Sequence, residues 1–106
     1  MAPRIKLMFT KRLKEARLAS GLSQRELGRR IGLSEDVVAN RVTRYERGTS
    51  EPDFETTSKM AKVLGVPLAY LLADNDVLAD IILAAASLPP REQKKLAAEL
   101  KSKGKS

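Results

Sequence analysis

Residues 23–48 read SQRELGRRIGLSEDVVANRVTRYERG, and the spacing within this stretch decides the fold. Two segments with helical periodicity meet at Gly32, which suits a tight turn because glycine adopts a left-handed backbone at the least cost. Gly28 is small at the position where the second helix must cross the first. The positions at which the two helices must pack together are all apolar: Leu27, Ile31, Leu33 and Val38. The stretch therefore predicts two short helices packed across a tight turn.

Both helices carry residues that favour their predicted ends. Ser23 and Glu26 fit a capping box, in which a side-chain oxygen and a carboxylate satisfy free backbone N–H groups. Ser34 is predicted to cap the second helix, whose first turn holds two acidic residues that suit the helix dipole. Gly48 is predicted to end that helix. This is the spacing of a helix-turn-helix.

Helical patterns cover the rest of the chain as well, separated by residues that start and stop helices. The predicted helices cover about residues 8–19, 23–31, 34–47, 53–64, 67–72, 76–87 and 90–101. We therefore predict an all-α protein. Its predicted parts are a basic N-terminal arm (1–7), a five-helix domain (8–73), a C-terminal helical pair (74–101) and a disordered basic tail (102–106).

The composition excludes several classes of function. The chain has no cysteine and no histidine, so it lacks a thiol nucleophile, the commonest general base and the commonest metal ligand. We therefore expect no enzyme, no metal site and no cofactor, and no small-molecule ligand is evident. The net charge of +7 favours a polyanionic partner such as nucleic acid. No apolar stretch is long enough to span a bilayer, so we expect a soluble cytoplasmic protein without a membrane partner.

Three segments resemble the Cro/cI-type helix-turn-helix domain, also called the XRE family, of phage repressors and bacterial regulators. They read RLKEARLASGLSQRELGRRIGLSEDV, TRYERGTSEPD and TTSKMAKVLGVPLAYLL, and the resemblance covers about residues 8–73. It implies a lambda-repressor-like five-helix domain that binds double-stranded DNA, and a bacterial or phage origin. The chain has about four residues more than usual between Gly32 and Tyr45. Because Val38, Val42 and Tyr45 keep one apolar stripe, we predict a recognition helix about one turn longer.

The face opposite that stripe is predicted to read bases in the major groove. It carries Asp36, Asn40, Thr43 and Arg47, with Arg44 beside them. Asparagine pairs with adenine, arginine with guanine, and aspartate accepts a hydrogen bond from the cytosine amino group. The resemblance adds Glu35, at a position where the family often reads a base. The alternative for these side chains is an ordinary solvated helix face.

Other residues are expected to contact phosphate or to hold the domain together. The resemblance implies that the start of the second helix grips the DNA backbone through Ser23 and Gln24, where free N–H groups favour an anion. Further candidates for phosphate contacts are Arg25, Arg29, Arg47 and Thr49. The resemblance also implies a structural ion pair between Arg17 and Glu46.

The C-terminal helical pair carries more apolar surface than one packing face needs. We predict a homodimer whose interface includes Val77, Leu78, Ile81, Ile82, Leu96 and Leu100. Alternatively, these helices only cap the domain. The leading prediction is a sequence-specific transcriptional regulator, a repressor that binds a palindromic operator as a dimer. One alternative is an antitoxin-like module whose C-terminal helices bind a partner protein. Another is a helix-turn-helix fold that has lost DNA binding.

Overall fold

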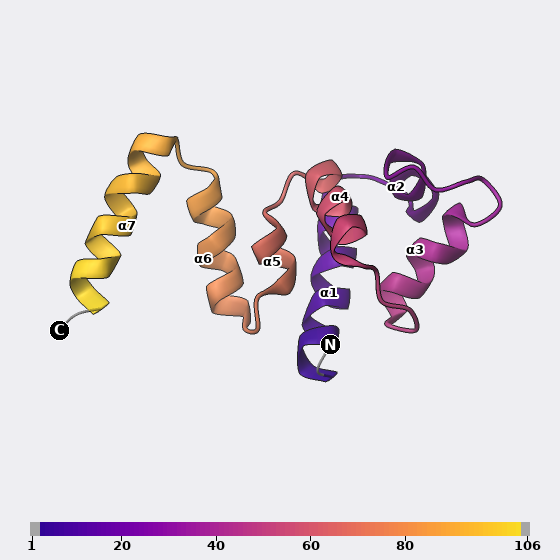
Figure 1. Cartoon of the computed structure of the whole chain (residues 1–106), viewed down its shortest axis with the longest axis horizontal. Helices are drawn as coiled ribbons and strands as arrows, with labels where there is room; N and C mark the ends of the chain where they lie inside the picture. The colour runs from indigo at the N-terminus through magenta and orange to yellow at the C-terminus, as the bar shows by residue number, and fades with distance from the viewer. Residues whose placement is uncertain (1–2, 105–106) are drawn as a thin grey trace.

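The computed structural model describes residues 3–104, which form seven α-helices and no strand within that range (Figure 1). The helices are α1 (Pro3–Ala19), α2 (Gln24–Arg30), α3 (Val38–Arg47), α4 (Phe54–Leu64), α5 (Leu68–Leu72), α6 (Asp76–Ala86) and α7 (Pro90–Gly104). The predicted all-α fold is confirmed. None of these helices is both long enough and apolar enough to cross a bilayer.

Helices α1 to α5, together with Ala79 of α6, enclose a single apolar core. The largest fully buried side chains come from all five of these helices, including Leu13 of α1, Leu27 of α2, Val42 of α3, Met60 of α4 and Leu71 of α5. Figure 1 shows α2 and α3 on one side of α1, while α5, α6 and α7 follow one another outward on the other side. The molecule is therefore elongated, with a longest extent of 53 Å. The helix pair α2–α3 and the C-terminal helices lie at opposite ends of it (Figure 1).

The helix-turn-helix forms as its sequence predicts at most positions. Ser23 caps α2, since its hydroxyl oxygen accepts a hydrogen bond of 3.0 Å from the backbone N–H of Glu26. Gly32 in the turn has a φ of 90°, and Gly48 after α3 has a φ of 75°, both in the left-handed region that favours glycine. The buried side chains of α3 are the predicted stripe: Val38, Val42 and Tyr45.

The start of α3 was predicted wrongly. The helix begins at Val38 and not directly after Ser34, and residues 34–37 form a turn. The Ser34 hydroxyl donates a hydrogen bond of 2.5 Å to the Asp36 carboxylate, so this serine makes a local side-chain contact there and does not cap a helix. Helical structure begins where Val38 packs against Gly28 of α2.

Both ends of the described chain are more helical than predicted. α1 begins at Pro3, so residues 3–7 of the predicted basic arm belong to this helix. The side chain of Lys6 lies against the backbone at Gly48, where a Cβ in place of the glycine hydrogen would be 3.1 Å from the lysine Cε. α7 continues to Gly104, so residues 102–104 of the predicted disordered tail are helical too. Residues 1–2 and 105–106 lie outside the described residues.

Arg12 of α1 is buried although it carries a charge, with a residue exposure of only 2%. Its guanidinium donates hydrogen bonds to the backbone carbonyls of Tyr70 and Ala73, and to the Asp76 carboxylate at 3.2 Å. Tyr70 and Ala73 lie in α5 and at its end, where carbonyl groups lack partners within the helix. Arg12 therefore satisfies these groups and ties α1 to the junction of α5 and α6.

Gly28 leaves no room for a side chain, which leads to a first prediction. A Cβ at this position would be 2.4 Å from the Val38 Cγ2 atom and 2.7 Å from the Val38 carbonyl oxygen. Gly28→Ala should therefore push α3 away from α2 and lower the free energy of unfolding by about 1–3 kcal/mol. Urea denaturation would measure this. Gly104→Ala is the control, because nothing lies within 4 Å of the corresponding Cβ. Equal stability of the two variants would contradict the prediction.

Candidate nucleic-acid interface

One face of α3 is polar, exposed and unpaired. The buried stripe of Val38, Val42 and Tyr45 fixes the helix on the core, which turns the opposite side outward. Exposed side chains on and beside that side are Asn40, Arg41, Arg44 and Arg47. Within residues 3–104 these four side chains make no hydrogen bond and no ion pair with another residue. They are therefore free to bind an external ligand, and three of the four are cations.

A buried ion pair fixes α1 to α3 beneath that face. The Arg17 guanidinium contacts both carboxylate oxygens of Glu46, at 2.5 Å and 3.1 Å, and also donates to the Leu22 carbonyl at 2.9 Å. Only 9% of the Arg17 side chain and 3% of the Glu46 side chain are exposed. The pair implied by the resemblance is thus present in the structure, as part of the framework and not of the exposed face.

Gln24 and Thr43 extend this network toward the exposed face. The Gln24 amide nitrogen donates to the Glu46 carboxylate at 3.0 Å. Its carbonyl oxygen lies 2.7 Å from the Thr43 hydroxyl, which also lies 2.8 Å from the Ala39 carbonyl. Both polar groups of Gln24 are therefore used inside the protein. Sequence reasoning missed these contacts, although Thr43 precedes Glu46 by three residues and so shares its side of α3.

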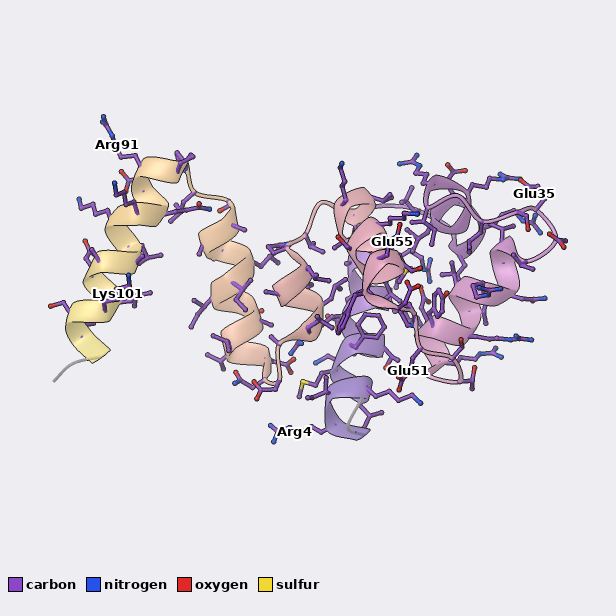
Figure 2. The ribbon with its side chains drawn as sticks, in the orientation of Figure 1. Arg4, Glu35, Glu51, Glu55, Arg91 and Lys101 are labelled. Atoms are coloured by element: carbon purple, nitrogen blue, oxygen red, sulfur yellow. The ribbon has the colours of Figure 1, made fainter. Side chains whose placement is uncertain are left out.

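The turn between α2 and α3 holds a second group of charges. The Glu35 carboxylate accepts hydrogen bonds from Arg29 Nε at 2.7 Å and from an Arg25 guanidinium nitrogen at 3.2 Å. Figure 2 shows Glu35 at the outer end of this turn. The hydrogen bond from Arg29 stabilises the charged carboxylate and lowers the pKa of Glu35. The hydrogen bond from the Ser34 hydroxyl lowers the pKa of Asp36.

The remaining candidates for phosphate contacts lie around these two groups. Ser23 uses its hydroxyl oxygen as the cap of α2. Thr49 is exposed after the end of α3, and its hydroxyl lies 3.4 Å from the Arg44 carbonyl. Arg47 lines a shallow hollow together with Lys6 of α1. The basic first turns of α1 therefore lie beside the end of α3, a proximity that the sequence pattern did not reveal.

The residues predicted for a dimer interface lie at the other end of the molecule. Val77, Leu78, Ile81 and Leu100 are exposed, whereas Ile82 and Leu96 are partly buried. Ile82 of α6, with Leu96 and Leu100 of α7, lines one apolar groove. No residue of α7 is buried within its range of 90–104. The C-terminal pair thus presents apolar side chains that the described chain does not cover.

Nothing in residues 3–104 indicates a metal centre, because no cluster of three or more acidic side chains has the geometry to hold an ion.

Comparisons with known proteins identify what this arrangement is similar to. A family model described as helix-turn-helix matches residues 13–71. The cryptic phage CTXphi transcriptional repressor RstR of Vibrio cholerae is 36% identical over 73 residues, which are 69% of this chain and 62% of that protein. The HTH-type transcriptional regulator ImmR of Bacillus subtilis is 34% identical over 67 residues, 63% of this chain and 50% of that protein. The chain thus spans between half and two thirds of the length of these curated relatives.

A solved structure extends the similarity to most of the chain. The crystal structure of transcriptional regulator BswR has a TM-score of 0.80 and 39% sequence identity, and the match covers 88% of this chain and 92% of that one. The relatives are transcriptional regulators and not enzymes, which agrees with the absence of a catalytic residue pattern in the sequence.

Proposed function

The chain belongs to the helix-turn-helix family of DNA-binding transcriptional regulators, and from this membership we propose that it is a repressor that binds a palindromic operator as a dimer. The observation that carries the proposal is the exposed face of α3, with its unpaired arginines and one asparagine. Such a helix fits the major groove of B-DNA, where arginine and asparagine side chains distinguish base pairs. The Vibrio cholerae relative is named a transcriptional repressor, which supports repression as the direction of regulation.

Asn40 and Arg44 are the proposed base-reading residues. Both are exposed near the middle of α3, and neither side chain has a partner within residues 3–104. Thr43 is half-buried and bonded to Gln24, so we propose that it orients α3 against α2 and touches DNA at most through its methyl group. Asp36 lies in the turn before α3, where its carboxylate accepts from Ser34, and we assign it no base.

Phosphate contacts are proposed on both sides of this reading face. The N-terminus of α2 and its cap Ser23 offer backbone N–H groups, while Arg25 and Arg29 lie along the same helix. Arg47 lies at the far end of α3 next to Lys6, and Thr49 follows just after that end. Contacts on both flanks would fix the angle at which α3 enters the groove.

The proposed dimer uses the exposed apolar side chains of α6 and α7. This location lies at the end of the molecule opposite α3, so two copies joined there keep both recognition helices free (Figure 1). A bound dimer would then repress by occupying the promoter, and the two half-sites would be related by a two-fold axis.

Selection of bound duplexes from a random DNA pool tests the proposal. The full chain would be used at physiological salt with competitor DNA, because charge alone gives salt-sensitive binding without sequence preference. An enriched inverted repeat is the expected result. Enrichment of a single half-site would contradict the dimer, and no enrichment would contradict specific recognition. In the latter case, the exposed apolar surface of α6 and α7 would favour the alternative of a partner-protein module.

A second prediction separates base reading from phosphate contact on α3. Arg44→Ala should weaken binding to the enriched site by about 1–3 kcal/mol and relax the preference at one base pair. Titration of a labelled duplex by fluorescence anisotropy would measure both effects. Arg41→Ala is a matched control, since Arg41 is also exposed and unpaired but lies toward the edge of the face. Equal losses on the enriched and on random duplexes would make Arg44 a phosphate contact.

A further inference from the structure

In the turn between α2 and α3, one carboxylate contacts two arginines. Under the proposed function, these arginines bind DNA phosphate groups. Glu35 accepts from Arg29 through two nitrogens, at 2.7 Å and 3.5 Å, and from Arg25 at 3.2 Å. Arg25 and Arg29 are four residues apart on α2, so both point from one side of that helix toward the turn. The three side chains form a compact group, hereafter the turn clamp.

The turn clamp is exposed, and its two guanidinium groups are of the kind that binds phosphate. Between 47% and 65% of each of its three side chains is accessible. A guanidinium binds carboxylate and phosphate oxygens with the same fork of N–H donors. No other acidic residue within residues 3–104 reaches Arg25, whereas Arg29 has only a longer contact of 3.7 Å with Glu26. Glu35 thus occupies donors on both arginines that a phosphate could use.

The position of Glu35 in the chain explains why it can reach both arginines. Residues 34–37 form a turn before α3 begins at Val38, and Glu35 sits at the outer end of that turn (Figure 2). If α3 continued back to Ser34, the carboxylate would be fixed to the helix. The non-helical turn instead lets its side chain fold back over α2.

From this geometry we infer that Glu35 is an internal competitor for DNA phosphate, which lowers the affinity of the protein for any duplex by occupying Arg25 and Arg29. The inference rests on the proposed DNA-binding function. A phosphate that approaches α2 must displace the carboxylate or share the two guanidinium groups with it. Glu35 then sets the strength of backbone binding and leaves the choice of bases to Asn40 and Arg44.

The test is Glu35→Gln in the full chain, measured by fluorescence anisotropy on a 20-base-pair duplex of random sequence over a range of salt concentrations. The variant should bind about three- to tenfold more tightly at low salt, as expected from the loss of exposed ion pairs. Its affinity should also fall more steeply with salt, by about one unit in the log–log slope, because one more phosphate is neutralised. On an enriched operator the base preferences should stay unchanged.

Two further variants test whether Glu35→Gln changes DNA binding through the turn clamp. Glu99→Gln makes the same charge change on α7, remote from α3, and should leave duplex binding nearly unchanged. In an Arg25→Gln/Arg29→Gln background, Glu35→Gln should no longer tighten binding. If it still does, Glu35 acts by direct repulsion of DNA and the inference is overturned.

The remaining outcomes distinguish this inference from the proposed function. Weaker binding by Glu35→Gln would overturn the inference and make Glu35 a residue that positions the arginines. A changed preference at one base pair would overturn it in favour of base reading by Glu35. Unchanged binding would overturn this inference alone, whereas failure of both the wild type and the variant to bind any duplex would overturn the proposed function as well.

Discussion

Replacing Glu46 with alanine should lower the free energy of unfolding by about 3–5 kcal/mol, the cost of leaving a buried charge without its partner. The Glu46 side chain is only 3% exposed and receives hydrogen bonds from Arg17 and Gln24. Once it is removed, the Leu22 carbonyl is the one hydrogen-bond partner that the Arg17 guanidinium keeps within residues 3–104. The loss should therefore come from the stranded arginine more than from the missing packing.

Urea denaturation followed by circular dichroism would measure this loss. Glu55→Ala is the matched control, because Glu55 is exposed and pairs with Lys59, at 3.6 Å. Exposed pairs of this kind contribute about 0–1 kcal/mol. The double variant Arg17→Met/Glu46→Leu should recover much of the stability, since it removes both charges together. A loss in Glu46→Ala no larger than in Glu55→Ala would show that the buried pair does not stabilise the fold.

The same substitution should also alter the arrangement of α2 against α3. Gln24 donates to Glu46 and accepts from Thr43, so it connects the two helices through the carboxylate. Without Glu46, the amide loses one of its two partners. The framework below the reading face is thus a single network, and its loss should weaken DNA binding even at temperatures where the variant stays folded.

Local sequence rules predicted the parts of this fold that depend on neighbouring residues. Ser23 caps α2, and Gly32 turns the chain with a positive φ. Gly28, which has no side chain, leaves room for Val38 to pack against α2. The spacing of the sequence indicates all three features. The resemblance to a known family also implied the pair of Arg17 and Glu46. Each of these features follows from a short pattern or from a motif that many related chains share.

The sequence could not predict features that depend on contacts between distant segments. Arg12 appears on a helical wheel as a surface cation, but the carbonyls that bind it are 58 and 61 residues away. Gln24 and Thr43 meet only after α2 and α3 have packed. The start of α3 was missed for a different reason. The local hydrogen bond between Ser34 and Asp36 competes with helix capping, and sequence alone does not say which wins.

The largest functional effect is expected far from DNA, at Ile81 on α6. Its side chain is 49% exposed and belongs to the apolar surface proposed to join two copies. Ile81→Asp would place a carboxylate without a partner in that interface, so sedimentation should report a monomer at concentrations where the wild type is dimeric. Binding to an inverted repeat should then weaken about 10²- to 10⁴-fold, because the two half-sites are no longer bound by linked domains.

The fold itself should survive Ile81→Asp, since the substituted side chain is not part of the buried core. Ala98→Asp provides the matched control: it adds the same charge at an exposed position of α7, about 160–200° around the helix from Leu96 and Leu100. This control should keep both the mass and the operator affinity of the wild type. If Ile81→Asp kept them as well, the surface of α6 and α7 would not be the dimer interface. If it lost operator affinity but remained a dimer, α6 would act on DNA binding by another route, such as its connection to α1 through Asp76 and Arg12.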